Sequence, residues 1–518
     1  MRLENILAAH AVRTPDKTAL VSGSQRVSYR ALHAGARAMA GGLRAVGVGP
    51  GDRVLVYLPN GVEFVQVLYA SFMLGAVVVP VNTRLTPKEL AYFAQDSAPV
   101  ALIVHSDSLD ALRSVESELA SCKWFVAGDK AAGRIALNSL STLGQGNAAP
   151  LAPVPLSAED CMIMYTSGTT GKPKGAVMTA ANFIVQHGYL NAIDWGICNN
   201  DCFLVTTPLA HRTGLARMLN ALCLGSTLVV MDRFDARAAV DLIEREQITA
   251  AGMVPTVARM LMPVLEKNAQ RCGSLRHIIV TGEAFPVDLK RALIALLPQV
   301  KLHSFFAMTE VGAVTTLNHE EQFTHPTSVG RPTPGVEVRL VNDEGKDVPT
   351  GEAGEMLVRS GVPGRFTTMV GYYKRPEETA ATIVDGWVRT GDMARMDDDG
   401  YYYIVDRKKD MVISGGFNIY TKEVEQALTE HPAILDAAVV GVPDAIFGES
   451  VAAFIEVRPG STLNAHEVGE HCKSRIASYK KPKHVYFVEA LPRNALGKVT
   501  KNDLRGMAAR NLAGEGAT

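Results

Sequence analysis

The chain has 518 residues, of which 47% are hydrophobic and 20% are charged, a composition typical of folded globular proteins that excludes a disordered or fibrous chain. Its 52 Lys and Arg residues nearly balance 53 Asp and Glu residues, so no global charge favours nucleic acid or anionic lipid as a partner. The length exceeds one ordinary hydrophobic core and predicts roughly two to four domains.

Cysteine usage indicates a reducing compartment. The seven cysteines form no CxxC pair, and an odd number spread over a long chain does not resemble a disulfide framework. Cys198 and Cys202 lack the nearby ligands that would complete a zinc site, so both are expected to pack in the fold. The first residues predict an amphipathic segment rather than a secretion signal, and the apolar stretch 67–81 is too short to span a bilayer. We therefore expect a cytoplasmic protein.

Helices and strands are predicted to alternate through the first part of the chain. A helix begins at an N-cap, Ser28, and runs to Leu43, and a Gly- and Pro-rich break then leads to an apolar strand at 54–58. The stretch 67–81 is interpreted as a buried helix that runs into a core strand. Further apolar strands are predicted at 101–104, 162–164, 227–231 and 278–281. This alternation predicts α/β layers with helices covering buried strands.

Beyond Ser328 the pattern changes to short strands separated by Gly, Pro and Asp turns. These strands are predicted at 336–340, 355–359, 387–390 and 401–405, and a last group at 437–442 and 452–457. A charged junction at 407–410 precedes the last group, which is long enough for a small independent domain. The predicted fold class is therefore α/β. Residues 1–408 form a large N-terminal domain of layered α/β subdomains plus a β-rich subdomain, and residues 409–518 form a small mobile α+β C-terminal domain.

The segment from Tyr165 to Gly175 concentrates hydroxyls, glycines and lysines directly after an apolar strand. Such a loop can surround a polyphosphate, because glycines let backbone N–H groups approach, hydroxyls donate hydrogen bonds and lysines neutralise charge. The candidate phosphate contacts are Thr166, Ser167, Gly168, Thr169, Thr170 and Lys174. The segment lacks GxxxxGK[ST], which excludes a P-loop NTPase. An ordinary surface hairpin is the alternative, because the same residue types build loops.

The order of these residues resembles the phosphate loop of the adenylate-forming (AMP-binding) superfamily, which includes acyl-CoA synthetases, luciferases and the adenylation domains of peptide synthetases. Gly282-Glu283-Ala284 resembles the family's adenine-contacting turn. Residues 305–310 resemble its YGxTE element, which implies that Thr309 contacts a nucleotide phosphate. It also implies that Glu310 binds magnesium, a hard cation that prefers oxygen ligands.

The YGxTE-like element departs from the family pattern at two positions. Phe306 stands where tyrosine is commoner, and it keeps an aromatic face for adenine stacking. Ala307 stands where glycine is commoner, and its extra methyl group is expected to narrow the space near the adenylate or the acyl pocket. A Thr-Glu pair is also a common helix start, which is the alternative for Thr309 and Glu310.

Three residues nearer the C-terminus complete the implied nucleotide site. Thr390-Gly391-Asp392 resembles the motif whose carboxylate accepts the hydrogen bonds of the ribose hydroxyls, and Arg407 resembles its arginine partner. Residues 492–499 resemble the loop of the family's catalytic lysine. Lys498 is therefore the implied cation between the substrate carboxylate and the α-phosphate. Taken singly, a Gly-Asp pair is usually a turn and an isolated Arg or Lys is usually a solvated charge.

Lys409 stands where the family has a hinge between two arrangements of the small domain. One arrangement presents Lys498 for adenylation, and the other presents a CoA-side loop for thioester formation. The CoA-side residues of this loop are Ser414, Gly415 and Gly416. Two glycines would let a pantetheine arm run close to the backbone, and a plain β-turn is the alternative. Thr421 stands where many relatives have proline, and the change is expected to loosen the segment without harm.

The acyl pocket is expected near His211, which resembles a family histidine at the carboxylate site. The alternative is that His211 is an ordinary histidine packed in the core. The helix after it is expected to contribute Thr213 and Arg217, and Ala307 is expected to line the same pocket. An Arg217 that faces the pocket would favour a polar or dicarboxylic substrate, whereas solvation on the helix surface is the commoner fate of an arginine. The basic run 479–483 is expected to be solvated, with CoA phosphates as its alternative partner.

The resemblance implies an acid–thiol ligase, an AMP-forming acyl-CoA synthetase of the fatty-acid–CoA ligase type. The carboxylate of the acid attacks the α-phosphate of MgATP and releases pyrophosphate, and the CoA thiol then attacks the acyl-adenylate and releases AMP. The implied catalytic residues are Lys498, Glu310 and His211. The enzyme would use ATP, Mg²⁺ and coenzyme A.

The implied partners are small molecules: a carboxylic acid, ATP and CoA. No nucleic acid or stable membrane insertion is expected, and a homodimer is left open. An adenylation enzyme that loads a carrier protein, a luciferase-like oxygenase and an inactive adenylate-binding regulator are the alternatives. The identity of the acid does not follow from the sequence.

Overall fold

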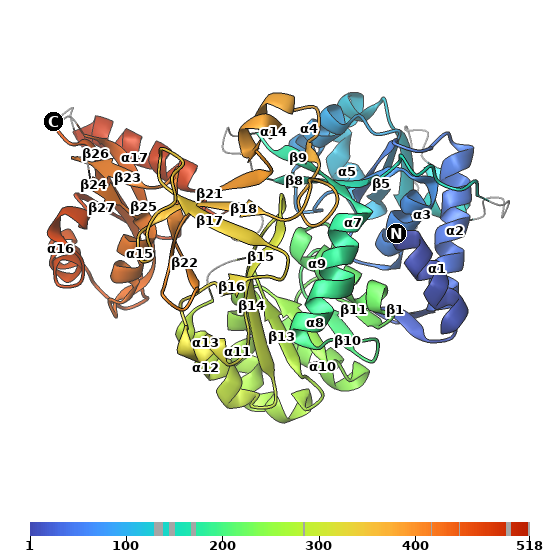
Figure 1. The fold of residues 1–518 in the computed structure, drawn as a ribbon, viewed down its shortest axis with the longest axis horizontal. Helices are drawn as coiled ribbons and strands as arrows, with labels where there is room; N and C mark the ends of the chain where they lie inside the picture. Colours follow the sequence, from blue (N-terminus) through green and yellow to red (C-terminus); the bar gives the residue numbers. More distant parts are fainter. Residues whose placement is uncertain are drawn as a thin grey trace. The chain divides into compact units, whose positions relative to one another are not determined.

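The computed structural model describes residues 1–128, 138–144, 151–166, 172–282, 285–415, 417–444, 446–493 and 499–515 (Figure 1). The chain divides into two compact units: unit 1 contains Met1–Val338 and Val358–Arg389, and unit 2 contains Arg339–Leu357 and Thr390–Thr518. The sequence predicts a domain boundary between residues 408 and 409 because it predicts a hinge there. The division into compact units does not test a hinge, so this boundary stays a prediction. Among the described residues, no helix is both long and apolar enough to span a membrane.

The first large sheet of unit 1 is mostly parallel. Its nine strands follow the order β16 (Arg331–Pro332), β15 (Gly312–Leu317), β14 (Lys301–Met308), β13 (His277–Val280), β12 (Ala250–Met253), β10 (Cys202–Val205), β11 (Thr227–Val230), β1 (Thr18–Ser22) and β2 (Gln25–Ser28). The strands from β14 to β1 are parallel, and antiparallel strands close both edges. The carboxyl ends of the parallel strands therefore meet at one edge of the sheet, where open α/β sheets hold their ligands.

The second large sheet of unit 1 has eight strands. They follow the order β19 (Gly371–Tyr372), β9 (Lys174–Thr179), β8 (Asp160–Thr166), β4 (Val77–Pro80), β3 (Arg53–Tyr57), β5 (Ala101–His105), β6 (Lys123–Ala127) and β7 (Asn138–Ser139). The strands from β8 to β7 are parallel, whereas β9 and β19 are antiparallel to their neighbours.

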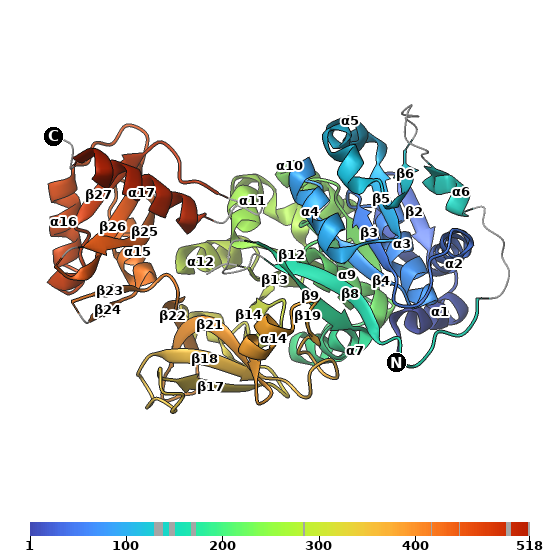
Figure 2. The ribbon, with the colours of Figure 1, turned by 90° about the horizontal axis from the view of Figure 1, so that it is seen from above.

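Helices form layers on both faces of these sheets. The helices of unit 1 are α1 (Leu3–Arg13), α2 (Tyr29–Ala45), α3 (Val62–Leu74), α4 (Pro87–Ser97), α5 (Leu109–Leu112), α6 (Leu140–Gly144), α7 (Ala180–Phe183), α8 (Asn191–Trp195), α9 (Arg212–Leu224), α10 (Ala236–Glu246), α11 (Pro255–Asn268), α12 (Val287–Leu296), α13 (Glu321–Thr324) and α14 (Pro376–Thr382). One apolar cluster joins α2, α3 and α9 to one face of each sheet. Helices α10, α11 and α12 cover the other face of the first sheet, beside β12 and β13 (Figure 2), and α4 and α5 cover the other face of the second.

The sequence predicts these strands because each is a short continuous run of apolar residues, whose side chains point alternately to the two faces of a buried sheet. In β3, Val54 and Val56 belong to the cluster around α2 and α3, whereas Leu55 belongs to the cluster under α4. The N-cap prediction is confirmed, since the Ser28 hydroxyl accepts a hydrogen bond from the Ala31 N–H at 3.2 Å. The apolar stretch 67–81 forms the end of α3 and then β4, as predicted. The α/β fold class is confirmed.

Unit 2 contains a sheet of its own covered by helices on both faces. Its strands are β23 (Val412–Ser414), β24 (Phe417–Ile419), β25 (Ile434–Asp444), β26 (Gly448–Val457) and β27 (His484–Val488). Its helices are α15 (Thr421–Thr429), α16 (Ala465–Lys473) and α17 (Lys501–Glu515). Helices α15 and α16 share one cluster with this sheet, and α17 packs on the opposite face. These elements form the predicted small α+β domain.

A smaller antiparallel sheet accounts for the predicted β-rich region. Its strands are β17 (Glu337–Val341), β18 (Gly354–Arg359), β20 (Ile383–Val384), β21 (Trp387–Met396) and β22 (Tyr402–Arg407). The division between the two units falls within β17, β18 and β21. The part of β21 in unit 2 pairs with β22.

Candidate functional site

The glycine-rich segment connects two antiparallel strands of unit 1. Strand β8 ends at Thr166 and β9 begins at Lys174, and these two residues face each other across the ladder. The predicted phosphate contacts between them, Ser167, Gly168, Thr169 and Thr170, lie outside the described residues. The hairpin therefore fixes the two ends of the loop at the edge where β8 finishes.

Glu310 lies beside this hairpin. Its carboxylate is almost fully buried, and Oε1 accepts a hydrogen bond from Thr166 Oγ1 at 3.3 Å and from the Tyr372 hydroxyl at 2.9 Å. Lys174 Nζ lies 5.1 Å from the centre of the Tyr372 ring. The structure thus brings the two ends of the hairpin, Thr166 and Lys174, together with Glu310, which is 144 residues from Thr166 in the sequence.

Tyr372 is a member of this group that the sequence did not predict. It lies in β19, a strand of two residues with no periodic signal. Burial and then the neighbouring Glu310 carboxylate raise the pKa of Tyr372 well above its usual range, so its hydroxyl keeps its proton and donates to the glutamate. The sequence Gly-Tyr-Tyr following Val370 was the available signal, and it carries no spacing argument by itself.

Thr309 and Glu310 lie in a turn between β14 and β15, not at a helix start. The chain reverses here because Gly312, at φ 79°, opens the antiparallel strand β15. The β14 ladder shifts register between Phe306 and Ala307, next to the turn. The helix-start alternative is therefore wrong for this pair.

The adenine-turn candidate follows β13, the parallel neighbour of β14. Gly282 has φ 101°, a left-handed backbone that glycine adopts without strain. Glu283 and Ala284 lie outside the described residues. Gly282 and Phe306 thus lie near the carboxyl ends of adjacent strands.

His211 ends the segment that connects β10 to α9, and it caps α9. Its Nδ1 accepts a hydrogen bond from the Thr213 N–H and lies 3.1 Å from the Thr213 hydroxyl. The ring is half-buried, whereas Thr213 is buried. These contacts fix the orientation of the imidazole at the start of α9, so the packed-core alternative does not describe it.

Solvation on the helix surface, the alternative to a pocket position for Arg217, is wrong. The residue lies in the middle of α9 and only 2% of it is exposed. Its Cζ lies 4.9 Å from the centre of the Trp195 ring and 5.6 Å from that of Phe305. Helix α9 is covered on both sides, because it packs in the cluster that joins the two large sheets, and no face of it at Arg217 reaches solvent.

In unit 2, Asp392 and Arg407 face each other across the ladder of β21 and β22. Arg407 Nε lies 2.7 Å from Asp392 Oδ1. The carboxylate is 3% exposed, whereas the arginine side chain is 45% exposed. The pairing that the sequence resemblance implied is therefore present as an ion pair, with its cation open to solvent.

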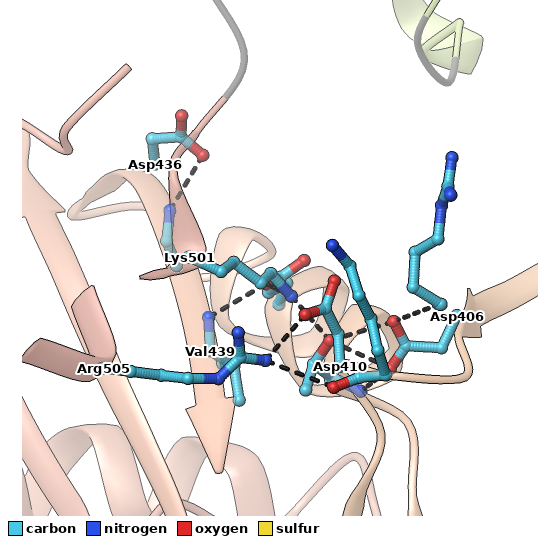
Figure 3. Close-up of polar contacts among 11 residues, drawn as sticks. Asp406, Asp410, Asp436, Val439, Lys501 and Arg505 are labelled. Atoms are coloured by element: carbon cyan, nitrogen blue, oxygen red, sulfur yellow. Dashed lines mark hydrogen bonds and ion pairs between the residues drawn. The ribbon is translucent and has the colours of Figure 1, made fainter. Parts of the chain in front are cut away.

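The hinge candidate Lys409 is exposed, and its carbonyl accepts a hydrogen bond from Arg505 at 3.4 Å. The same guanidinium bonds to Asp410 at 2.7 Å, as Figure 3 shows. Helix α17 is therefore tied to the segment that follows β22.

The expected loosening at Thr421 is wrong. Its backbone N–H and its hydroxyl both donate to the buried carboxylate of Asp406, and Lys501 Nζ donates to the hydroxyl at 2.6 Å. Figure 3 shows Lys501 and Asp406 in this network. Proline has no N–H and no hydroxyl, so threonine tightens this position instead of loosening it.

The CoA-side loop begins at Ser414, the last residue of β23. Gly415 has φ 58°, and a Cβ there would lie 3.2 Å from Phe447. Gly416 and the implied catalytic residue Lys498 lie outside the described residues. In the basic run, Lys480 pairs with Glu423 and Lys483 pairs with Asp444, both at 2.6 Å. Two of these lysines are therefore held by carboxylates of unit 2 and are not simply solvated.

Comparison with known proteins places this chain in a family. The profile of the AMP-binding enzyme family matches residues 7–373, and that of the AMP-binding enzyme C-terminal domain matches residues 423–498. The chain belongs to the AMP-binding enzyme family. Curated relatives of this AMP-binding enzyme are CoA ligases. A long-chain fatty-acid–CoA ligase of Mycobacterium tuberculosis is 34% identical over 96% of this chain and 97% of its own length. A feruloyl-CoA synthase of Amycolatopsis is 35% identical over 95% and 96%.

Solved structures of the family share the whole fold of this AMP-binding enzyme. ATP-bound MatB from Rhodopseudomonas palustris has a TM-score of 0.87 and 30% identity, and the match covers 98% of this chain and 99% of that one. The o-succinylbenzoate CoA synthetase of Bacillus subtilis, in complex with ATP and a magnesium ion, has a TM-score of 0.83 and 29% identity over 96% and 98%. The chain is therefore an enzyme of the CoA ligase type within the AMP-binding family.

Proposed function

We propose that this enzyme is an acyl-CoA synthetase that converts a carboxylic acid and MgATP to an acyl-adenylate and then transfers the acyl group to CoA. The observation that carries the proposal is the buried Glu310 carboxylate beside Thr166 and Lys174 at the two ends of the glycine-rich hairpin. This geometry puts a carboxylate, a hydroxyl and a lysine at one place, as a magnesium–triphosphate site requires.

The oxygen donors at this place fit Mg²⁺. Glu310 contributes a carboxylate and Thr166 a hydroxyl, and Mg²⁺ commonly takes few protein ligands when it arrives with phosphates. Within the described ranges, no cluster of three His, Cys, Asp or Glu side chains could hold a metal by itself. Bound with ATP, the ion would neutralise phosphate charge. Tyr372 would keep the Glu310 carboxylate in place through its hydrogen bond.

The chain's other residues would position the reactants. In unit 1, Gly282 and Phe306 would contact adenine, Thr309 a phosphate, and His211 the acid. In unit 2, Asp392 would accept the ribose hydroxyls while Arg407 holds its carboxylate. Because the ion pair already fixes one oxygen of Asp392, the diol needs little rearrangement to bind.

In the first half-reaction, a carboxylate oxygen of the acid forms a bond to the α-phosphorus of ATP, and the bond to the β-phosphate oxygen breaks. Lys498 would lie between the two anions and offset their repulsion. In the second, the CoA sulfur attacks the acyl carbon, its proton is released, and AMP leaves. Lys409 would act as the hinge that exchanges the Lys498 loop for the loop of Ser414, Gly415 and Gly416.

Two assays test the proposal against its alternatives. Pyrophosphate exchange into ATP that depends on a carboxylic acid is expected, and its absence with every class of acid would support an inactive adenylate-binding regulator. A thioester with free CoA is expected in the second assay. Transfer only to an added carrier protein would instead support a carrier-loading enzyme. The cytoplasmic location and a homodimer stay predictions.

A further inference from the structure

Arg217 is a buried cation without a counter-charge among the described residues. Both terminal nitrogens, Nη1 and Nη2, are buried and have no hydrogen-bond partner there. Burial lowers the pKa of Arg217 to about 9, so the guanidinium is still charged at neutral pH. An unpaired buried charge is expensive, which makes such a group a strong attractor for an anion.

The surroundings are shaped to hold this arginine. Its stem packs on Gly252 of β12, where a Cβ would lie 2.3 Å from Arg217 Cγ. Its guanidinium lies near the rings of Trp195 and Phe305, which attract a cation through their faces but accept no ordinary N–H···O bond. The missing side chain at 252 and the two aromatic rings therefore fix the position of the cation and leave its N–H groups available.

Two further donors beside Arg217 also lack partners in the described chain. Trp195 Nε1 is buried and unpaired, and so is His187 Nε2. The Asn191 side-chain amide lies 3.3 Å from His187 Nδ1. An amide N–H donating to Nδ1 leaves the hydrogen of a neutral ring on Nε2, so His187 is a donor as well. Burial, and then Arg212 and Arg217, lower the pKa of His187 and keep the ring neutral. The environment thus offers one cation and two N–H donors, which is the chemistry that binds an oxyanion.

The position of Arg217 connects this environment to the proposed reaction site. His211, the candidate for the acid's reacting carboxylate, caps the same helix, α9. Six residues along a helix correspond to roughly 9 Å. Phe305 of β14, which packs on the guanidinium, directly precedes the segment Phe306–Glu310, which ends β14 and begins the turn after it. An acid that binds His211 at one end and Arg217 at the other would have to span a separation of about 9 Å.

We propose that Arg217 is a specificity-determining residue that pairs with a second carboxylate of the substrate, so that the preferred acids are dicarboxylic acids. This inference rests on the proposed function. A monocarboxylic acid of the same length would leave the arginine, Trp195 Nε1 and His187 Nε2 unpaired, because a methyl group accepts no hydrogen bond.

The preference for dicarboxylic acids is tested by pyrophosphate exchange into ATP in the presence of different carboxylic acids. The acids compared are dicarboxylic acids of about four to eight carbons, their monomethyl esters and monocarboxylic acids of equal length. The wild-type kcat/KM is expected to be at least about 30-fold higher for the best dicarboxylic acid than for its matched monocarboxylic acid. The Arg217→Met variant is expected to lose this preference. The ratio of the two kcat/KM values does not depend on the fraction of folded enzyme, so partial misfolding does not disturb the comparison.

Two more variants test whether Arg217 itself sets the ratio of kcat/KM for dicarboxylic over monocarboxylic acids. Trp195→Phe keeps the aromatic face and removes one N–H, and it is expected to lower the ratio by less than Arg217→Met does. Arg13→Met removes an exposed arginine of α1 and is expected to leave the ratio unchanged. If Arg217→Met does not fold, the wild-type ratios and Trp195→Phe decide the question.

Three outcomes would overturn the inference. The wild type could prefer monocarboxylic acids, or use monomethyl esters as well as dicarboxylic acids, which would mean that a neutral acceptor suffices. The ratio could also be unchanged in Arg217→Met. In each case exchange with some acid persists, so the proposed function stands. Absence of exchange with every acid would instead overturn the proposed function and this inference together.

Discussion

The hydroxyl of Thr166 donates a hydrogen bond to Oε1 of Glu310 at 3.3 Å. The two residues come from different sheets: Thr166 ends β8, and Glu310 follows β14. Their contact places the end of the glycine-rich hairpin against a buried carboxylate.

Replacing Glu310 by Gln should lower acid-dependent pyrophosphate exchange by about 100-fold or more, because the neutral amide loses the charge proposed to bind magnesium. The amide keeps the size of the side chain, so folding should be little changed. The exchange rate as a function of Mg²⁺ concentration measures the effect. Glu266→Gln, an exposed carboxylate of α11, is the control and should behave as wild type. Equal rates for the two variants would remove Glu310 from the proposed site.

Replacing Asp392 by Asn should raise the KM for ATP by roughly 30-fold. The change removes the charge that pairs with Arg407 and weakens the acceptor proposed for the ribose hydroxyls. Steady-state exchange kinetics at varied ATP measure it, together with calorimetry of AMP binding. Asp343→Asn alters an exposed carboxylate that pairs with Lys408, and its KM should not change. An unaltered KM in Asp392→Asn would mean that the ion pair is only structural.

Replacing Lys498 by Ala should lower the rate of adenylation by at least about 100-fold, because the cation proposed to lie between the two reacting anions is lost. Thioester formation from a preformed acyl-adenylate should fall only slightly, since the CoA-side loop is intact. The two half-reactions are measured separately by pyrophosphate exchange and by release of AMP. Lys473→Ala, an exposed lysine of α16, serves as the control. An equal loss of both half-reactions would contradict a hinge at Lys409.

Replacing Thr421 by Val should lower the free energy of local unfolding in unit 2 by about 1 to 3 kcal/mol. The variant keeps the shape but removes the hydroxyl shared by Asp406 and Lys501. Hydrogen exchange of the α15 amides measures this opening free energy. Thr429→Val should change it little, because among the described residues the Thr429 hydroxyl bonds to backbone carbonyls of its own helix. Equal protection in the two variants would mean that the network contributes nothing to stability.

Acid should destabilise unit 1 through His303. Burial lowers the pKa of His303 to about 3, and its ring contacts His277 and Asn318 at 3.2 and 3.1 Å. In the unfolded chain the pKa returns to its ordinary value of 6.5, so the unfolded state binds the extra proton below that pH. The neutral His303 ring therefore makes its full contribution to the free energy of unfolding above pH 6.5. This free energy falls as the pH drops from 6.5 toward 3, with a slope of up to about 1.4 kcal/mol per pH unit.

Urea unfolding between pH 7 and pH 5 measures this dependence. The variant His303→Gln should show a smaller loss of stability over that range than the wild type does. His466→Gln, an exposed histidine, should keep the wild-type dependence. Parallel curves for the wild type and His303→Gln would show that another group titrates.

Much of the architecture could be predicted because it depends on local patterns. The cap at Ser28, the apolar strand β3 and the helix and strand within residues 67–81 each depend on a few neighbouring residues, and the structure has them where they were expected. The candidate site was found because its residues occur in short motifs. Tyr372 has no such motif, and only the packing of β19 beside β9 places its hydroxyl on Glu310.

The sequence by itself determined the α/β fold class, the family and the residue types at the proposed nucleotide site, since these depend on periodicity and on motifs that are contiguous in the chain. Only the tertiary structure decided that Arg217 is buried and that Thr421 bonds to Asp406 and Lys501. An arginine on a helix is solvated or buried according to what covers that helix, and here Gly252, Trp195 and Phe305 come from three other elements. Likewise, the hydroxyl of Thr421 bonds to Asp406 and Lys501 because the fold brings both to it from other positions in the sequence.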